Sequence, residues 1–250
     1  MNGRTALVTG ASRGIGAAIG LAYAAQGMRV ALQYGRSQEA ARAVLASLAG
    51  EGHLLVQADV SEPEEVRRMV AEAGEAFGRL DVLVNNAGIF EPTPFDTEDF
   101  DDWQAGWKRV LDTNLMSAVH ATWAALPLMR SQGRGKVINV ASRSAFRAET
   151  EAPAYAVSKA GMVNLTRCLA RAEAKSGILA YCIAPGWVET AMARDSVRDL
   201  GLEALTADIP LKRIATVEDV AGVAVFLASE AANYLTGITI PVTGGSWMTT

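Results

Sequence analysis

The chain has 250 residues, of which half are hydrophobic and 20% are charged, and its formal net charge is -4. This length and apolar content are enough to bury a large core in one α/β domain. The sequence is mildly acidic and has no run of Lys and Arg. That argues against nucleic acid as a partner, because phosphate binding needs clustered cations.

The cysteines, histidines and apolar stretches exclude several further classes of protein. Cys168 and Cys182 form no CxxC pair and lie in apolar stretches, so we expect two buried free thiols. His53 and His120 lack metal-ligand spacing, so no metal site is predicted. The apolar run Thr5–Thr9 ends in a glycine turn, which leaves no room for a signal peptide, and no stretch approaches the roughly 20 residues of a membrane span. We therefore expect a cytoplasmic protein without a membrane partner.

Short apolar runs alternate with longer helical patterns along the chain. The predicted strands are Ala6–Thr9, Arg29–Gln33, Leu54–Ala58, Val82–Val84, Lys136–Val140, Leu179–Ile183 and Ile238–Pro241. The predicted helices are Gly16–Gln26, Gln38–Leu48, Glu64–Phe77, Trp103–Met129, Pro153–Ala174 and Val217–Ala228. Most of the strands are continuous apolar runs, which is typical of strands buried on both faces of a parallel sheet. The alternation predicts an α/β fold with a doubly wound, mainly seven-stranded parallel sheet and helices on both faces.

Helix start signals and one irregular segment complete this pattern. Ser61 and Thr216 each precede acidic residues, which predicts a hydroxyl cap with carboxylates in the first helical turn. No linker-like composition or internal repeat interrupts the chain, so residues 1–250 are predicted to form a single domain. Within it, residues 187–210 are too long for a plain loop and predict a substrate lid that contains short helices.

The segment Thr9–Gly16 reads TGASRGIG and lies between the first predicted strand and the first predicted helix. Glycines there permit a tight turn and let backbone N–H groups approach a pyrophosphate, which the N-terminus of a helix also attracts. Because glycines occur in many loops, a purely structural turn is the alternative. The place of this segment near the start of an α/β chain favours dinucleotide binding.

Further polar and glycine-containing segments follow in order, each explicable alone as a turn, a cap or a satisfied buried amide. They are Asp59-Val60, Asn85-Asn86-Ala87-Gly88, Asn114, Ser142, the pair Tyr155 and Lys159, and Pro185-Gly186 with Val188 and Thr190. Tyr155 and Lys159 are four apart on a predicted helix, so they project from one face. In isolation this pair would be an ordinary surface Tyr and Lys. Asn114 is a poor residue for the middle of a helix without a specific partner.

Together, in order and spacing, these segments resemble the motifs of the short-chain dehydrogenases/reductases over nearly the whole chain, and the sequence looks like the 3-oxoacyl-carrier-protein reductase branch. The resemblance implies a Rossmann-type fold. It also implies a homotetramer, with interfaces formed by the fourth and fifth helices and the C-terminal segment.

The resemblance implies catalytic roles for Asn114, Ser142, Tyr155 and Lys159. Tyr155 would act as the acid/base, Ser142 would bond the substrate oxygen, and Lys159 would hold the nicotinamide ribose. Asn114 would bond helix backbone through water and complete a proton relay to Lys159. A free tyrosine has a pKa of about 10, and the Lys159 ammonium is expected to lower it. The implied cofactor-binding residues are Gly10, Ser12, Arg13, Gly14, Ile15, Gly16, Arg36, Ser37, Asp59, Val60, Asn86, Ala87, Gly88, Tyr155, Lys159, Pro185, Gly186, Val188 and Thr190.

The end of the second predicted strand bears on the choice of cofactor. An acid there holds the ribose 2′-OH of NAD, whereas a cation favours the 2′-phosphate of NADP. Tyr34 stands at the position of the acid, Arg36 and Ser37 follow, and Arg13 adds a guanidinium from the glycine loop. Gly35 stands where a basic residue is frequent, so Arg36 must reach from one position later. NADP(H) is therefore predicted, with NAD(H) as the alternative.

We predict an NADP(H)-dependent oxidoreductase that moves a hydride between nicotinamide and a ketone or secondary alcohol, with a 3-oxoacyl thioester as a candidate substrate. The alternative is a non-catalytic nucleotide-binding or sensing protein on the same fold. The run Asp101–Trp107 and Thr243 depart from the usual pattern and leave the substrate open. Arg143 and Arg147 are candidates to contact an acidic substrate, but a solvated loop is favoured because charges usually stay in water.

Overall fold

One parallel sheet organises the protein, whose computed structural model describes residues 1–193, 198 and 201–248. Within these residues, seven strands lie in the order β3-β2-β1-β4-β5-β6-β7, and every neighbouring pair is parallel. The strands are β1 (Thr5–Val8), β2 (Arg29–Tyr34), β3 (Leu54–Gln57), β4 (Val82–Asn85), β5 (Gly135–Val140), β6 (Ile178–Pro185) and β7 (Thr239–Val242). The predicted fold class is confirmed.

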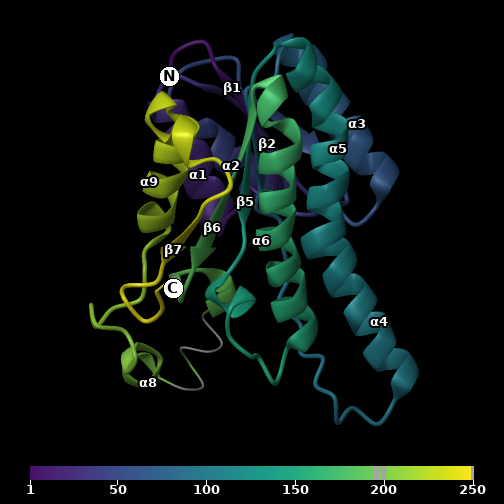
Figure 1. The fold of residues 1–250 in the computed structure, drawn as a ribbon, viewed down its shortest axis with the longest axis vertical. Helices are drawn as coiled ribbons and strands as arrows, with labels where there is room; N and C mark the ends of the chain where they lie inside the picture. The colour runs from purple at the N-terminus through teal and green to yellow at the C-terminus, as the bar shows by residue number, and fades with distance from the viewer. Residues whose placement is uncertain (194–197, 199–200, 249–250) are drawn as a thin grey trace.

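Helices cover both faces of this sheet (Figure 1). One face carries α1 (Gly14–Ala25), α2 (Gln38–Ala46) and α9 (Val217–Ala228). The other carries α3 (Pro63–Phe77), α5 (Ser117–Ser131) and α6 (Pro153–Glu173), with α4 (Phe100–Leu111) leading into α5. The short helix α8 (Leu202–Thr206) and the start of α4 project beyond the end of the sheet at the bottom of Figure 1.

The central strands are mainly apolar because each face packs against a separate core. In β1, Ala6 and Val8 join the core under α1 and α9, while Leu7 joins the core under α3 and α5. All three side chains are fully buried. Burial on both faces removes the apolar-polar alternation of a half-exposed strand, which explains the continuous runs in the sequence.

The strand order shows where a ligand crevice lies in this sheet. From β1 the chain moves outward to β2 and β3, then returns to β4 on the other side of β1. The loops after β1 and β4 therefore diverge, and ligands of open α/β sheets bind in the crevice at such a switch point. The glycine loop follows β1, and Asn86-Ala87-Gly88 follows β4.

The predicted helix Trp103–Met129 is interrupted and begins earlier than expected. Asp99 caps α4 by accepting hydrogen bonds from the backbone N–H groups of Asp101 and Asp102. Between α4 and α5, residues Asp112–Met116 form a π-helical turn. Such a turn inserts one extra residue into the helical ladder, so residue periodicity alone does not reveal it.

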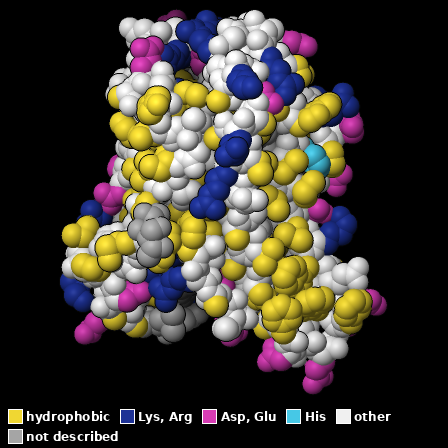
Figure 2. Space-filling view, viewed as in Figure 1, with side chains coloured by type: hydrophobic (Ala, Val, Ile, Leu, Met, Phe, Trp, Pro, Cys, Tyr) yellow, Lys and Arg dark blue, Asp and Glu magenta, His cyan; other side chains and the backbone are white. Residues whose placement is uncertain are grey.

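The run Asp101–Trp107 belongs to an aromatic cluster at the start of α4. The rings of Phe95 and Phe100 lie 6.0 Å and 5.8 Å from that of Trp103, and their side chains remain 75% and 65% exposed. Figure 2 shows hydrophobic side chains gathered over this end of α4.

Of the two hydroxyl side chains predicted to cap helices, Thr216 does so and Ser61 does not. Thr216 caps α9 in a reciprocal capping box with Asp219, as predicted. Ser61 does not cap α3, because its hydroxyl donates to the Asp59 carboxylate at 2.6 Å and Glu62 takes the cap position.

The expectation of two buried thiols is half wrong. Cys182 is buried in β6, whereas Cys168 is exposed. Cys168 lies on α6, whose buried positions include Met162, Val163 and Thr166, so helical periodicity turns residue 168 to the outside.

The part of the chain that the structure describes contains neither a membrane-spanning helix nor a metal-binding cluster of side chains. No helix there has the length and apolar character needed to cross a bilayer. Nor does any group of three or more His, Cys, Asp or Glu side chains in that part come together as a metal site. The predicted lid, residues 187–210, includes α8, while residues 194–197, 199 and 200 lie outside the described residues.

Candidate functional site

The glycines of the loop after β1 stand where other segments approach too closely for a side chain. Gly10 and Gly14 have φ values of +64° and +58°, which favour glycine. A Cβ on Gly10 would lie 2.9 Å from the Ala87 Cα. A Cβ on Gly16 would lie 2.5 Å from both the Gly10 carbonyl oxygen and the Asn86 Nδ2. The loop thus packs directly against the segment that follows β4.

Polar side chains hold these two segments together. The Thr9 hydroxyl accepts hydrogen bonds from the backbone N–H groups of Asn86 (2.9 Å) and Ala87 (3.0 Å). The Asn86 amide donates to the carbonyl oxygens of Thr9 (2.9 Å) and Gly10 (3.3 Å). Asn86 therefore holds the glycine loop in place. This structural role stands beside the cofactor contact that the resemblance implies for Asn86.

Gln33 is a positioning residue that the sequence reasoning missed. Its side-chain oxygen accepts from the Gly10 N–H at 2.6 Å, and its amide donates to the Ala58 carbonyl at 2.8 Å. It is 2% exposed and bridges the glycine loop to the end of β3. The available signal was a polar residue near the end of an otherwise apolar strand.

A cavity lies beside the glycine loop, between α1 and the segment after β6, and its lining includes Arg13 and Gly14 but not Tyr155 or Lys159. Its volume is about 1020 Å³, and Ala17 and Thr190 also line it. This volume is at the upper end of the range for ligand sites. Gly14 begins α1, a helix with no acidic residue in its first turn. Its N-terminal N–H groups and dipole suit a pyrophosphate. Ser12 and Ile15 flank this point and are partly exposed.

The residues at the end of β2 and just after it differ in their exposure to solvent. Tyr34 is buried at the end of β2, while Arg36 and Ser37 are exposed. Hydrogen bonds from the hydroxyl and N–H of Ser61, together with the positive charge of Arg36, hold the pKa of Asp59 below its usual value. Asp59 thus has a local turn role as well as the adenine contact implied by resemblance, and Val60 beside it is 9% exposed.

The segment after β6 approaches the glycine loop from the opposite side. Pro185 ends β6, and the Gly186 N–H donates to the Val242 carbonyl at 2.9 Å. Val188 pairs with Ala215 in an isolated bridge. The Thr190 methyl would lie 3.5 Å from a Cβ placed on Gly14. The structure therefore brings Thr190 and Gly14 to the two sides of one cavity.

Tyr155, Ser142 and Lys159 meet at the start of α6. Ser142 follows β5, and its side chain interacts with the Tyr155 phenol in the direction that lowers the pKa of Tyr155. The Lys159 Nζ lies 5.6 Å from the centroid of the Tyr155 ring, so the two side chains turn toward each other. The edge of the Phe90 ring contacts Tyr155, with the ring centroids 5.1 Å apart. A phenol, a hydroxyl and an ammonium are therefore available around one point.

The pKa of Tyr155 differs from the prediction. Burial raises it above the ordinary value, the Ser142 hydrogen bond opposes this rise, and the nearby carboxylate of Glu149 adds to it. The Lys159 ammonium does not lower it in the protein alone. Because Lys159 lies on the ring side of Tyr155 and donates to another acceptor, its charge is not directed at the phenol oxygen.

Lys159 is almost completely buried, with 4% of its surface exposed. Its Nζ donates to the Val140 carbonyl at 3.0 Å and lies 3.7 Å from the Met162 sulfur. Burial lowers the pKa of Lys159 to about 8. Lys159 is therefore protonated in most molecules at neutral pH, and the protonated fraction falls as the pH rises through about 8.

Asn114 lies inside the π-helical turn and is fully buried. Its Oδ1 accepts from the Ile89 N–H at 2.7 Å, and its Nδ2 donates to the Ile89 carbonyl at 2.9 Å. Nδ2 also reaches the Ser158 hydroxyl at 3.2 Å, which in turn donates to the Tyr155 carbonyl at 2.6 Å. Asn114 thus bonds the backbone of Ile89 directly, and Ser158 is a second contact that the sequence reasoning missed.

The chain is similar to known proteins over almost its whole length. The family model described as enoyl-(acyl carrier protein) reductase matches residues 10–246. A 3-oxoacyl-[acyl-carrier-protein] reductase from Synechocystis is 39% identical, with 99% of this chain and 98% of the relative covered. The chain belongs to the short-chain dehydrogenase/reductase family. It is therefore an oxidoreductase that uses a nicotinamide cofactor.

Other members of the family agree in sequence and structure. An acetoacetyl-CoA reductase from Shinella zoogloeoides is 35% identical, with 98% of each chain covered. The crystal structure of a candidate short-chain alcohol dehydrogenase from Sinorhizobium meliloti superposes with a TM-score of 0.90 at 37% identity, covering 98% of this chain and 97% of that one. These matches support a short-chain oxidoreductase over the alternative of a non-catalytic nucleotide binder.

Proposed function

We propose that this protein reduces a ketone to a secondary alcohol with NADPH, and catalyses the reverse oxidation, using Tyr155 as acid/base. The observation that carries the proposal is the meeting of Tyr155, Ser142 and Lys159 at the start of α6, with the Lys159 Nζ 3.4 Å from a Cβ placed on Gly88. The nicotinamide supplies the hydride when bound. Among the relatives, enzymes named for 3-oxoacyl-[acyl-carrier-protein] and acetoacetyl-CoA support a 3-oxoacyl thioester as a candidate substrate.

Each catalytic side chain has one task in this proposal. The Tyr155 hydroxyl donates its proton to the carbonyl oxygen during reduction, and removes it during oxidation. Ser142 donates a hydrogen bond that fixes the same oxygen. Lys159 holds the nicotinamide ribose. A raised pKa for Tyr155 keeps the phenol protonated before reduction, and the positive charge of the oxidised cofactor favours its ionisation during oxidation.

Substitution of Tyr155 tests this assignment. In Tyr155→Phe, kcat for reduction of an active ketone should fall roughly 100- to 10,000-fold, because the proton donor is lost. NADPH affinity, measured by nucleotide fluorescence, should change little. Tyr234→Phe is the matched control, since Tyr234 is fully exposed. Wild-type turnover by Tyr155→Phe would remove Tyr155 from the mechanism.

We propose that NADP(H) is preferred over NAD(H), with Arg36, Ser37 and Arg13 near the 2′-phosphate. Wild-type kcat/KM should then be at least about tenfold higher with NADPH than with NADH, and Arg36→Ala should remove most of that difference. Arg42→Ala is the control, because Arg42 is an exposed cation on the neighbouring α2. A wild-type preference for NADH would contradict the assignment.

We propose one domain over residues 1–250, with residues 187–210 as a substrate lid, in a cytoplasmic protein. We also propose a homotetramer built on α4 and α5, which together span the fourth predicted helix, on α6, which is the fifth, and on the C-terminal segment. Exposed apolar side chains support those interfaces: Trp123 on α5 is 65% exposed, and Met248 near the C-terminus is 72% exposed.

A further inference from the structure

Arg143 is a largely buried cation next to the proposed catalytic serine. It follows Ser142 directly, and only 13% of its side chain is exposed. The expectation of a solvated loop is therefore wrong for Arg143, whereas Arg147 is 46% exposed. The Arg143 Cδ would lie 3.7 Å from a Cβ on Gly186, so its side chain runs against the segment beside the proposed nicotinamide site.

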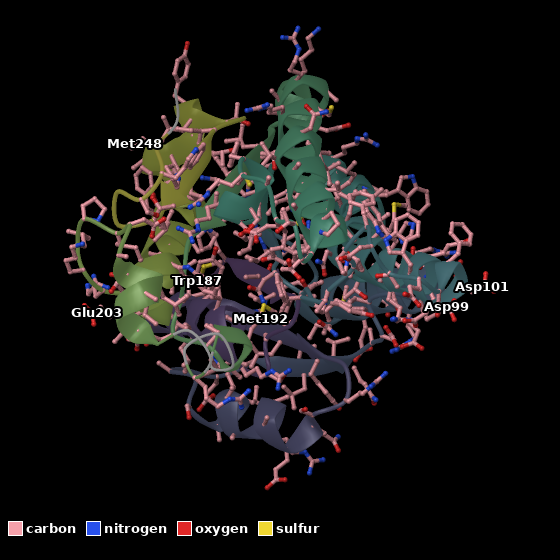
Figure 3. The ribbon with its side chains drawn as sticks, turned by 90° about the horizontal axis from the view of Figure 1, so that it is seen from below. Asp99, Asp101, Trp187, Met192, Glu203 and Met248 are labelled. Carbon is pink, nitrogen blue, oxygen red and sulfur yellow. The ribbon has the colours of Figure 1, made fainter. Side chains whose placement is uncertain are left out.

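The guanidinium of Arg143 lies over the Trp187 ring, with its Cζ 5.7 Å from the ring centroid. Figure 3 looks onto the end of the sheet that carries the lid, and shows Trp187 and Met192 toward the middle of that end. Asp99 and Asp101, at the start of α4, lie at its periphery. The cation is therefore held in the central part of this end of the molecule.

One nitrogen of Arg143 carries all its hydrogen bonds to the described residues. Nη1 donates to Asp208 at 3.3 Å and to the Ser246 hydroxyl at 3.2 Å. Within the described residues, Nε and Nη2 donate no hydrogen bond. These two nitrogens form one edge of the guanidinium, and their parallel N–H groups match the two oxygens of a carboxylate.

Two carboxylates lie near Arg143, and each has another partner. Asp208 also binds Arg147 at 3.1 Å, and Glu149 accepts a hydrogen bond from Ser144 at 2.8 Å. Burial lowers the pKa of Arg143, while Asp208 and Glu149 oppose this effect. The neighbouring acids therefore offset part of the cost of burying this charge.

The surrounding contacts fix Arg143 rather than leaving it mobile. The Ser246 hydroxyl also donates to the Thr243 carbonyl at 3.0 Å, and the Thr243 hydroxyl donates to the Trp247 carbonyl at 2.8 Å. Trp247 stacks on Phe146 with ring centroids 4.1 Å apart. The C-terminal segment thus clamps the loop that carries Ser142 and Arg143. Thr243, which departs from the usual pattern, belongs to this clamp.

We propose that the Nε and Nη2 edge of Arg143 binds a carboxylate of the substrate, so that the enzyme acts on an oxo acid or hydroxy acid. This inference rests on the proposed hydride transfer and narrows its substrate class. It favours a free acid over a thioester, which carries no charge in place of the carboxylate.

Matched acids and esters test the inference. Pyruvate, acetoacetate and levulinate, which place the ketone at increasing distance from the carboxylate, are each compared with the methyl ester by NADPH oxidation. For at least one pair, wild-type kcat/KM should be at least about tenfold higher for the acid. Arg143→Met keeps the length of the side chain against Gly186 and removes the charge. It should lower the acid-to-ester ratio for that pair roughly 10- to 100-fold.

Two further variants make the result specific. Arg147→Met removes the neighbouring exposed cation and should leave the ratio unchanged. Arg143→Lys keeps a charge without the planar fork and should give an intermediate ratio. Equal or better activity of wild type on every ester would overturn the inference while leaving hydride transfer intact. An unchanged ratio in Arg143→Met would overturn it too. Absence of NADPH oxidation with every acid and ester would instead contradict the proposed function.

Discussion

Burial moves the pKa values of Lys159 and Tyr155 in opposite directions. The ammonium is disfavoured in a low-dielectric surrounding, and so is the phenolate. The pKa of Lys159 therefore falls to about 8, whereas that of Tyr155 rises. In the protein alone, the phenol stays protonated over the pH range in which the lysine titrates.

The separation of these two groups predicts a pH dependence that belongs to Lys159. NADPH affinity, measured by nucleotide fluorescence, should fall as pH rises through about 8, because the neutral amine loses an N–H donor and its charge. NADPH affinity falls with rising pH because the protonated form of Lys159 is the one that binds. Since its pKa is lowered, this form is depleted above about pH 8 rather than above 10.5.

Two variants identify the group that titrates. Lys159→Arg keeps its proton throughout this range and should lose the descending limb near pH 8. Tyr155→Phe should retain that limb. If Lys159→Arg kept the wild-type pH profile, another group would be responsible.

At the scale of elements, the glycine loop and the segment after β4 are built as one unit. Thr9, Asn86 and Gln33 supply the hydrogen bonds, and the glycines let the backbones approach. Close packing of this kind tolerates little added volume. The orientation of the loop toward the cofactor therefore depends on the absence of a few specific Cβ atoms.

Substitution of Gly16 by alanine should separate this steric effect from helix propensity. The added Cβ would meet Gly10 and Asn86 at 2.5 Å, so Gly16→Ala should destabilise the fold by about 1–3 kcal/mol and weaken NADPH binding. The matched control is Gly222→Ala in α9, where a Cβ would meet nothing within 4 Å. That control should stabilise the fold by about 0.5–1 kcal/mol.

Thermal unfolding and nucleotide titration measure both variants of this pair. An equally stable Gly16→Ala protein with unchanged NADPH affinity would show that the loop can move to accept the methyl group. The π-helical turn is a comparable device on the other side of the site, because it directs the Asn114 amide to the backbone of Ile89.

At the scale of the whole molecule, apolar side chains remain exposed on the proposed subunit interfaces. Trp123 is 65% exposed on α5, and an aromatic cluster surrounds the start of α4. Large exposed apolar groups indicate contact with another protein surface. We propose that α4 and α5 pack against a second copy of the chain.

Light scattering tests this assembly directly. Wild type should have about the mass of four chains, and Trp123→Glu should shift the mass toward smaller species because it places a charge in an apolar interface. Arg42→Glu introduces the same side chain on α2, outside the proposed interfaces, and should keep the mass of wild type. A monomeric wild-type protein would contradict the proposed tetramer.

The order of strands and helices, the turn at the glycine loop and the positions of the candidate catalytic residues could be predicted from the sequence. Apolar periodicity and the conformational freedom of glycine act over a few residues, so they can be read locally. Thr216 and Asp219 form the expected capping box for the same reason. Family membership came from several such segments in their order, and it implied the roles of Ser142, Tyr155 and Lys159.

Only the tertiary structure decided the surroundings of those side chains. Arg143 is largely buried because Asp208 and Ser246, 65 and 103 residues later in the chain, fold onto it. The pKa of Tyr155 is raised because distant segments exclude water from the phenol. Burial and electrostatics depend on which segments meet in space, and spacing along the chain does not specify those meetings. The fold and the family could thus be predicted from the sequence. The protonation states and contacts of the candidate site depend instead on how distant segments pack together.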